Sequence, residues 1–514
     1  MASSLIRGKY VICKVSGRTG AEIVHDGAVF QRDGTIVEIG PYQTLAQKYR
    51  PDEVIGSAEH VVMPGFVNSH HHQGLTPFQL GSPAYPLELW LASSLGVRDV
   101  DLYLDTLYSA FEMVESGVTT VQHLHGWRPG PATEWPDLAE RILSAYRDIG
   151  MRVSYSFAVC DQNLLVYGAD GDFVKRLPPT LAAPMEAMLR ALDVPLREYM
   201  DFFEHLWQRW DRDAGGRTRV QLAPANLHWC SDEALTMLGE YAARYGVGLH
   251  MHLLESAYQK AYARRRTGST AIRHLHELGL LGPQLTLGHG VWLTEDDIDL
   301  VAQSGALFCH NASSNLRLRS GIAPLNHVTA RGVPVALGID EAGLNDDRDM
   351  LQEMRLVLAL HRTPGMGDDV PTAAQVVRMA TEYGARTTGF AREIGTLEAG
   401  KAADLAVMNW RHLAYPYLDR EVPVIEALVQ RGRPAGIETV LVAGEVILRD
   451  GRFARVDKTA ALEELAAALR APLRPDEQAR RDLIRRVIPH VRRFYEGWLD
   501  QTTTDPFYDL NSRR

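Results

Sequence analysis

The sequence predicts an α/β protein: a (β/α)8 TIM barrel that carries a small β-sandwich domain formed by the N- and C-terminal segments. Three observations support this fold class. Eight apolar runs of strand length alternate with helix-like stretches. Short β-rich runs separated by turn dipeptides occupy both ends of the chain. Histidine or acidic residues follow several of the central runs, where a barrel places its active site.

The eight central runs account for the predicted barrel strands. Their span exceeds the ~250 residues typical of this barrel, which leaves room for insertions. The segment 178–216 is the largest candidate insertion, and it is either a lid over the barrel mouth or a helix pair packed on its side. The loop 75–97, which contains Trp90, follows the first strand and is expected to shape a pocket. The predicted strands are 61–68, 118–122, 152–158, 220–224, 247–252, 285–288, 306–309 and 335–339.

Three units follow from these patterns. Residues 1–62 and 394–456 form the composite β-sandwich domain, with turns at Asp26-Gly27 and Asp33-Gly34. Residues 63–393 form the catalytic barrel. Residues 457–514 form a helical, arginine-rich tail whose apolar stripe predicts docking on the barrel or on a second subunit.

Composition excludes several classes of partner. The net charge of −10 argues against nucleic acid or an anionic membrane as the main partner. The four cysteines form no C-x-x-C pair, which fits a reducing compartment. We find neither a secretory signal nor an apolar run of about 18 residues, so we expect a cytoplasmic protein with no membrane span. We expect a small-molecule substrate and a homo-oligomer.

The strongest chemical signal is the passage Pro64-Gly65-Phe66-Val67-Asn68-Ser69-His70-His71-His72. Residues i and i+2 of a strand share a face, so His70 and His72 point the same way. Two imidazoles at one strand end can bind one divalent metal ion. This passage therefore predicts a metal site.

A second strand end carries His250, His252 and Glu255. His252 is the better ligand candidate because Glu255 follows it at the start of the loop over the site, whereas His250 can lie deeper in the barrel. A carboxyl group beside the metal can carry protons from water to a leaving group. Glu255 is therefore a catalytic candidate, the alternative being a solvent-facing carboxylate at a helix start.

Two further strand ends carry single candidates. His289 ends the sixth run and is placed to face the substrate and polarise it, the alternative being a core histidine. Asp340 ends the eighth run and is expected to act both as an acidic metal ligand and as a base for water. Glu341 and the acidic stretch after it favour a cationic or amine-bearing substrate, or they cap a helix through its dipole.

Together these elements resemble the amidohydrolase superfamily, specifically its cytosine deaminase, guanine deaminase and triazine hydrolase branch. The resemblance spans roughly residues 5–453. It includes the histidine passage, Gly117-Val118-Thr119-Thr120, Ser314-Asn315, Ala385-Arg386 and the passage 394–405.

The resemblance implies one divalent metal held by His70, His72, His252 and Asp340. It implies Glu255 as proton shuttle and His289 as the group that polarises the substrate. The bridging lysine of two-metal branches is missing from residues 220–226, which favours a single ion. We expect zinc, with iron(II) as the alternative. The substrate-binding candidates are His289, Asn315, Glu341 and Trp90.

These features predict a metal-dependent hydrolase that cuts a non-peptide carbon–nitrogen bond of a small molecule. The first hypothesis is hydrolytic deamination of a nitrogen-rich heterocycle, which Glu255 favours. The second is hydrolysis of a linear amide, urea or carbamate, which the acidic stretch and the inserted segment leave open. A metal-free scaffolding relative is the third, although every expected ligand is present.

Overall fold

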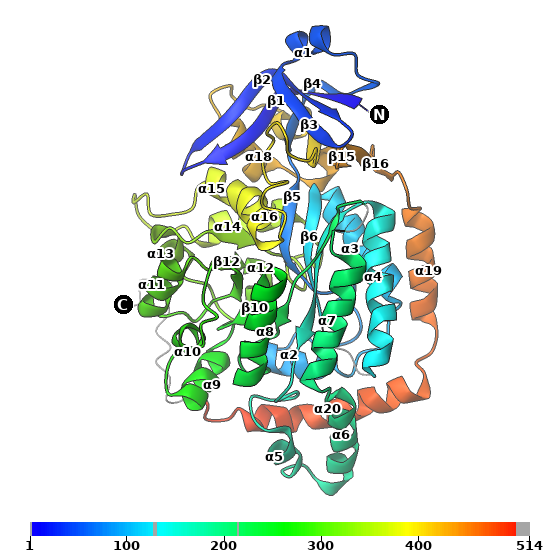
Figure 1. Ribbon diagram of the computed structural model, residues 1–514, viewed down its shortest axis with the longest axis vertical. Coiled ribbons are helices and arrows are strands. Elements are labelled where there is room, and N and C mark those ends of the chain that lie inside the picture. The colour runs from blue at the N-terminus through cyan, green and yellow to red at the C-terminus, as the bar shows by residue number, and fades with distance from the viewer. Residues whose placement is uncertain (1–2, 127–130, 213–214, 500–514) are drawn as a thin grey trace.

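The computed structural model describes residues 3–126, 131–212 and 215–499 (Figure 1). Eight parallel strand positions of this part of the chain close into a barrel in chain order, which confirms the predicted fold. Two four-strand ladders are joined by bridges between Leu222 and Leu249 and between His71 and Asp340. The strands are β5 (Phe66–His71), β6 (Val118–His125), β7 (Arg152–Val159), β8 (Thr218–Val220) with β9 (Ala223–Pro224), β10 (Leu249–Leu253), β11 (Leu285–His289), β12 (Leu307–His310) and β13 (Val335–Leu337).

The first barrel strand differs from its prediction. The run 61–68 was expected to be one strand, but β4 (Glu53–Pro64) ends at Pro64 and β5 begins at Phe66. Gly65 separates them because the chain passes directly over Thr119: a β-carbon at Gly65 would lie 2.2 Å from Thr119 Oγ1. The run therefore serves two sheets, one on each side of this glycine.

Helices surround the barrel, and the largest predicted insertion joins them. Rings of α7 pack on the barrel side, with Tyr199 4.9 Å from Trp135 and Phe202 5.2 Å from Phe157 between ring centroids. No described residue of 178–216 lines the barrel-mouth cavity. Helix α7 packs on the barrel side, whereas α6 packs against α20 (Pro475–Phe494) at the barrel end. The helices are α2 (Leu87–Ser94), α3 (Leu102–Glu115), η1 (Ala132–Glu134), α4 (Trp135–Ile149), α5 (Asp170–Val174), α6 (Pro179–Leu192), α7 (Leu196–Trp210), α8 (Asp232–Tyr245), α9 (Ala257–Thr267), α10 (Ala271–Glu277), α11 (Glu295–Ser304), α12 (Ala312–Arg317), α13 (Leu325–Ala330), α14 (Met350–Leu360), α15 (Ala373–Arg378), η2 (Met379–Tyr383) and α16 (Gly384–Thr387).

The two β-rich ends of the chain meet in one hydrogen-bonded sheet, as the composite domain requires. Strand β4 pairs with β1 in parallel and with β14 in antiparallel orientation, so it joins the two halves. The order is β17-β16-β15-β14-β4-β1-β2-β3, and Ile6, Val29 and Leu405 share one core. The remaining elements are β1 (Ser3–Ser16), β2 (Gly20–Arg32), β3 (Thr35–Pro41), α1 (Tyr42–Lys48), β14 (Leu405–Asn409), α17 (Trp410–Ala414), α18 (Val424–Arg431), η3 (Pro434–Gly436), β15 (Ile437–Val442), β16 (Glu445–Arg449) and β17 (Arg452–Phe453).

The C-terminal tail docks on its own barrel through the part that the structure describes, which ends at residue 499. Helix α19 (Lys458–Arg470) packs along α3, and α20 (Pro475–Phe494) packs on α2 and α6. Figure 1 shows α20 crossing the end of the barrel opposite the β-domain. Among the described residues, no helix combines the length and apolar character needed to cross a bilayer. All four cysteines are buried and free.

A buried ion pair connects the barrel to the β-domain. Arg152 Nε and Nη2 donate to Asp404 at 2.6 and 3.2 Å, and the two side chains are 4% and 2% exposed.

We expect Arg152→Leu to lower the free energy of unfolding by about 3–5 kcal/mol, since it leaves a buried carboxylate without its cation. Urea denaturation measures this loss. The exposed Lys175, paired with Asp172, is the control: Lys175→Met is expected to change stability by less than about 1 kcal/mol. Equal losses of stability in the two variants would contradict a special contribution of the buried Arg152–Asp404 pair.

Candidate metal centre and active site

The predicted chemical residues converge at the carboxyl ends of four barrel strands. His70 lies in β5 and His72 follows it, His252 lies in β10, His289 ends β11, and Asp340 follows β13. The backbone ties two of these ends together, because the Asp340 N–H donates to the His70 carbonyl at 2.8 Å. Barrel closure thus brings side chains 270 positions apart in the chain into one site.

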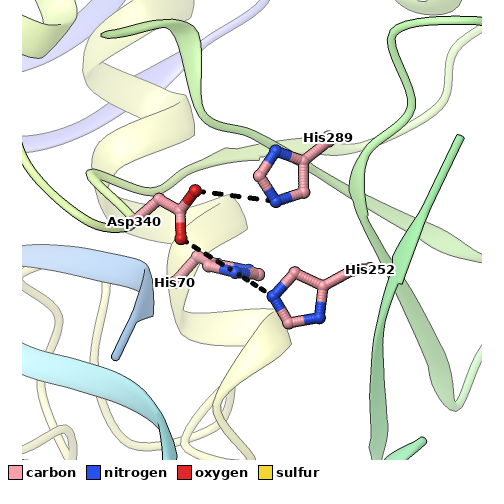
Figure 2. Close-up of side chains that lie close together, drawn as sticks. All are labelled: His70, His252, His289 and Asp340. Atoms are coloured by element: carbon pink, nitrogen blue, oxygen red, sulfur yellow. Dashed lines mark hydrogen bonds and ion pairs between the residues drawn. The ribbon is translucent and has the colours of Figure 1, made fainter. Parts of the chain in front are cut away.

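Three imidazoles and one carboxylate share a single centre. The Nε2 atoms of His70, His72 and His252 lie 3.0–3.2 Å from one another. Asp340 Oδ1 lies 3.4 Å from His70 Nε2 and 3.1 Å from His72 Nε2. Figure 2 shows His70, His252 and Asp340 pointing at this centre from different strands. Nitrogen and oxygen donors clustered this closely are typical of a tetrahedral divalent-metal site.

Hydrogen bonds at the opposite ring nitrogens orient these imidazoles. His72 Nδ1 donates to the Leu124 carbonyl at 2.6 Å, and His252 Nδ1 donates to the Ala225 carbonyl at 2.8 Å. A neutral imidazole that carries its proton on Nδ1 has a free lone pair on Nε2. These lone pairs therefore point into the common centre, where a cation would accept them. The donor set fits a divalent metal ion on this ground.

The pKa shifts of the four proposed ligands support the same metal centre. Burial lowers the pKa values of His70 and His252 well below the ordinary value, so both rings are neutral ligands. Burial acts on His72 in the same direction, but the Asp340 carboxylate outweighs it and raises the His72 pKa. Although burial opposes it, the imidazoles of His289 and His72 hold the pKa of Asp340 below its ordinary value. Asp340 is therefore an anion at neutral pH.

Two glycines make room for His70 in the barrel interior. A β-carbon at Gly338 would lie 2.5 Å from His70 Cβ, and one at Gly288 would lie 3.0 Å from His70 Cε1. Larger residues at either position would displace the imidazole. The small residues before His289 and Asp340 are thus part of the metal centre.

Backbone strain is concentrated at the site. Leu254, His289 and Asp340 have φ values of 51°, 70° and 61°, in the left-handed region that residues other than glycine seldom adopt. Each lies at or just after a strand carboxyl end, where the chain turns. Strain of this kind persists where surrounding contacts enforce it and is frequent at functional sites.

His289 and Glu255 lie beside the metal centre. His289 Nδ1 is 2.9 Å from Asn315 Oδ1, and its Nε2 is 3.2 Å from Asn311 Nδ2 and 3.7 Å from Asp340 Oδ2. The donor atoms of His289 also lie within 4.8 Å of those of His70, His252 and Asp340. His289 Nε2 already has Asn311 as a partner, which makes His72 the better fourth donor.

Glu255 is a buried acid next to this centre. Its Oε1 lies 3.6 Å from His289 Nδ1 and accepts a hydrogen bond from Ser320 Oγ at 3.4 Å. Burial raises the pKa of Glu255 well above its ordinary value, and the charges of Asp340 and Glu88 act in the same direction. This shift favours the protonated form of Glu255, which is the form that a general acid needs.

A cavity connects these groups with several substrate-binding candidates. It is lined by His72, His252, Glu255, His289 and Asp340, together with Trp90 and Glu341. Burial raises the pKa of Glu341 to about 7. Asn315, predicted to bind substrate, is not among the lining residues and lies behind His289 instead. Its position is that of a residue that orients the imidazole.

Several contacts of the site could not be predicted from the sequence. Ser314 Oγ donates to Asp340 Oδ2 at 2.6 Å, and His250 Nε2 lies 2.9 Å from His70 Nδ1. The i, i+2 spacing of His250 and His252 was a signal for a shared strand face, but it does not reveal which neighbouring ring His250 meets. Arg480 and Tyr495 of the tail also line the cavity, and their sequence carries no chemical motif.

His250 provides a test of this orientation. We expect His250→Leu to weaken metal binding by about 10–100-fold, because His70 Nδ1–H loses its acceptor. Competition with a chromophoric chelator measures the affinity. His250→Gln, which restores an acceptor oxygen, is expected to recover most of it. Wild-type affinity in the leucine variant would remove His250 from the metal centre.

Comparison with known proteins agrees with this geometry. The model of the amidohydrolase family matches residues 61–447, well over half of the chain. The chain belongs to the amidohydrolase family. With its deaminase-named relatives, this membership makes the chain a hydrolase of non-peptide carbon–nitrogen bonds, as the sequence predicts.

Two relatives and two solved structures illustrate the similarity of this amidohydrolase. A 5-methylthioadenosine/S-adenosylhomocysteine deaminase of Syntrophobacter fumaroxidans is 30% identical over 85% of this chain and 92% of its own. A 5'-deoxyadenosine deaminase of Methanosarcina mazei is 28% identical over 91% and 98%. An adenosine deaminase from Xanthomonas campestris with bound zinc has a TM-score of 0.76 at 24% identity, covering 95% of this chain and 99% of its own. A zinc-bound atrazine chlorohydrolase from Arthrobacter aurescens has a TM-score of 0.74 at 21% identity, covering 90% and 99%.

Proposed function

We propose that this amidohydrolase removes the exocyclic amino group of a nitrogen-rich heterocycle as ammonia. The observation that carries the proposal is the buried Glu255 carboxyl, which lines the same cavity as His72, His252 and Asp340. Departing ammonia needs a proton, and Glu255 would supply it. The names of the relatives, which are deaminases of adenosine-type compounds, support a purine as the first substrate to test.

The proposed reaction also requires a divalent metal ion. His70, His72, His252 and Asp340 would hold one divalent ion, with zinc as the proposed identity and iron(II) as the alternative. Its contribution when bound is Lewis acidity, which makes water acidic enough to ionise near neutral pH. Zinc-bound structural neighbours support the choice of zinc.

The chain's own residues then move the protons. Asp340 accepts the proton of the attacking water, with Ser314 holding its Oδ2. His289 lines the cavity with its Nε2 3.7 Å from that oxygen, and an imidazole that carries its proton on Nε2 would stabilise the negative charge that develops on the substrate. The water oxygen bonds to the ring carbon, the carbon–nitrogen bond breaks, and Glu255 protonates the leaving nitrogen. Trp90 and Glu341 would contact the substrate from the cavity wall.

The test is a substrate screen with defined products. The zinc-loaded protein is assayed with aminopurines, aminopyrimidines and aminotriazines, and separately with linear amides, ureas and carbamates. We expect ammonia release from a heterocyclic amine. Turnover confined to the linear compounds, with release of a larger amine or CO2, would overturn the deaminase proposal. A purified protein that binds no divalent metal would support the scaffolding hypothesis.

Location and assembly complete the proposal. The four free, buried cysteines fit a reducing compartment, and we propose the cytoplasm. A homo-oligomer stays a prediction, which sedimentation velocity tests directly.

A further inference from the structure

Helix α20 covers the open end of the barrel, and it lies beyond the part of the chain that matches the family model. In Figure 1 the helix runs across the barrel end opposite the β-domain, beside α2 and α6. Its buried face, Ile484, Val487, Ile488 and Val491, has helical spacing. This face joins residues of α2, of the loop after β7 and of α6 in one apolar cluster, separate from the barrel core. The mouth of the barrel therefore has a hydrophobic core of its own.

Two glycines let α20 approach closely. A β-carbon at Gly96 would lie 3.0 Å from Ile484 Cβ, and one at Gly168 would lie 3.1 Å from Phe494 Cζ. Gly96 follows α2 and Gly168 lies in the loop after β7, so α20 is held against both flanks of the mouth. Packing this tight gives the helix one position, rather than a loose association.

Tyr495, directly after α20, forms part of the cavity wall. It is 7% exposed, and its hydroxyl oxygen accepts a hydrogen bond from the Tyr167 N–H at 3.1 Å. The two rings meet edge to face with centroids 5.4 Å apart. Tyr167 and Tyr495 line the same cavity as His72, His252 and Asp340. The tail thus completes the enclosure in which the reaction takes place.

Arg480, Arg98 and Glu88, three charged residues at this part of the cavity, form hydrogen bonds within the protein. Arg480 donates to Asp99 Oδ1 and to the Val97 carbonyl, each at 2.8 Å. Arg98 donates to the Leu469 carbonyl at 2.6 Å. The Glu88 carboxyl accepts hydrogen bonds from the hydroxyls of Tyr167 and Ser256, and its burial raises its pKa. A charged substrate group would have to compete for these partners.

Apolar and aromatic side chains form much of the remaining cavity wall, and Asn163, His228 and Gln259 are polar members of it. The apolar and aromatic residues are Trp90, Leu91, Leu95, Leu164, Leu165 and Trp229. We propose that α20 and Tyr495 complete a binding subsite, continuous with the metal centre, for an uncharged apolar substituent on the heterocyclic amine. Tyr495 is the specificity-determining residue of this subsite. The inference rests on the proposed function for the identity of the reacting group.

Three adenines that differ only in one substituent test the subsite. They carry hydrogen, an n-butyl group or an ammonium-terminated butyl group on the same imidazole nitrogen. We expect wild-type kcat/KM for ammonia release to favour n-butyl over the other two by about 10-fold or more, because an apolar pocket discriminates on this scale. Tyr495→Ala is expected to reduce that preference about 10-fold, while the metal content stays at the wild-type value.

Phe494 provides the matched control. It is an aromatic residue next to Tyr495 that packs on Phe173 and Trp498 and is not among the lining residues. Phe494→Ala is expected to keep the wild-type preference. An unchanged preference in Tyr495→Ala, or equal wild-type rates for the apolar and charged compounds, would overturn the inference.

Measurements of ligand affinity test the subsite independently of the proposed deamination. Calorimetry on zinc-loaded Glu255→Gln measures the affinities of the three adenines without turnover. Tighter binding of the n-butyl compound to this variant supports the subsite even if the wild-type protein releases no ammonia from the three adenines. The absence of ammonia would overturn only the proposal that these purines are deaminated. Equal affinities, or no binding of any of the three, would overturn the subsite.

Discussion

Glu255→Gln is expected to lower kcat by about 10²–10⁴-fold, the usual contribution of a general acid or base. Glutamine fills the same space but cannot deliver a proton to the leaving nitrogen. Glu255 Oε1 contacts Ser320 and His289, and the residue is not one of the four convergent donors. The metal content should therefore stay at the wild-type value. Steady-state ammonia release and metal analysis on the same preparation measure both quantities.

Glu353→Gln is the matched control for this prediction. Glu353 is also buried, its carboxyl accepts the Ser313 N–H at 3.1 Å, and it is not among the residues that line the cavity. Burial raises its pKa to about 7, so the substitution removes a titratable group from a comparable environment. We expect kcat to change by less than about 3-fold, since no proton transfer involves it. Equal losses in both variants would mean that burial alone explains the effect.

Asp340→Asn is expected to remove both metal and activity. The variant loses the single anionic donor of the centre, whose Oδ1 lies 3.1 Å from His72 Nε2, and it also loses the base that accepts the proton of water. Because the ion makes water ionisable near neutral pH, we expect turnover to fall by at least about 10³-fold. Metal affinity should fall by more than the 10–100-fold typical of residues that only orient a ligand. Chelator competition and ammonia release measure the two losses.

The neighbouring carboxyl provides the comparison. Glu341 lines the cavity, but its side chain is not one of the convergent donors. Glu341→Gln is expected to retain the metal at wild-type affinity, whatever it does to substrate binding. A protein that loses its metal on Glu341→Gln but keeps it on Asp340→Asn would require a different ligand set. Restored activity of Asp340→Asn in excess zinc would show that Asp340 only binds the ion and does not act as the base.

Sequence periodicity predicted most of the barrel because each barrel strand is a short apolar run with its own boundaries. It failed at 61–68, where the apolar run continues through Gly65 although the chain changes sheets. The reason is the contact of Gly65 with Thr119, which lies in another strand and is invisible to local pattern. Local pattern also did not reveal that Asn315 Oδ1 lies against His289, and a substrate contact of Asn315 stays a prediction.

By itself, the sequence determined which residues can do the chemistry. The i, i+2 spacing of His70 and His72 is a local consequence of strand geometry, and the positions of His252, His289 and Asp340 at strand ends follow from the repeating βα pattern. Tertiary structure alone decided how these groups are oriented and enclosed. The hydrogen bonds at the ring nitrogens and the position of α20 depend on contacts between distant segments, and these exist only once the barrel has closed.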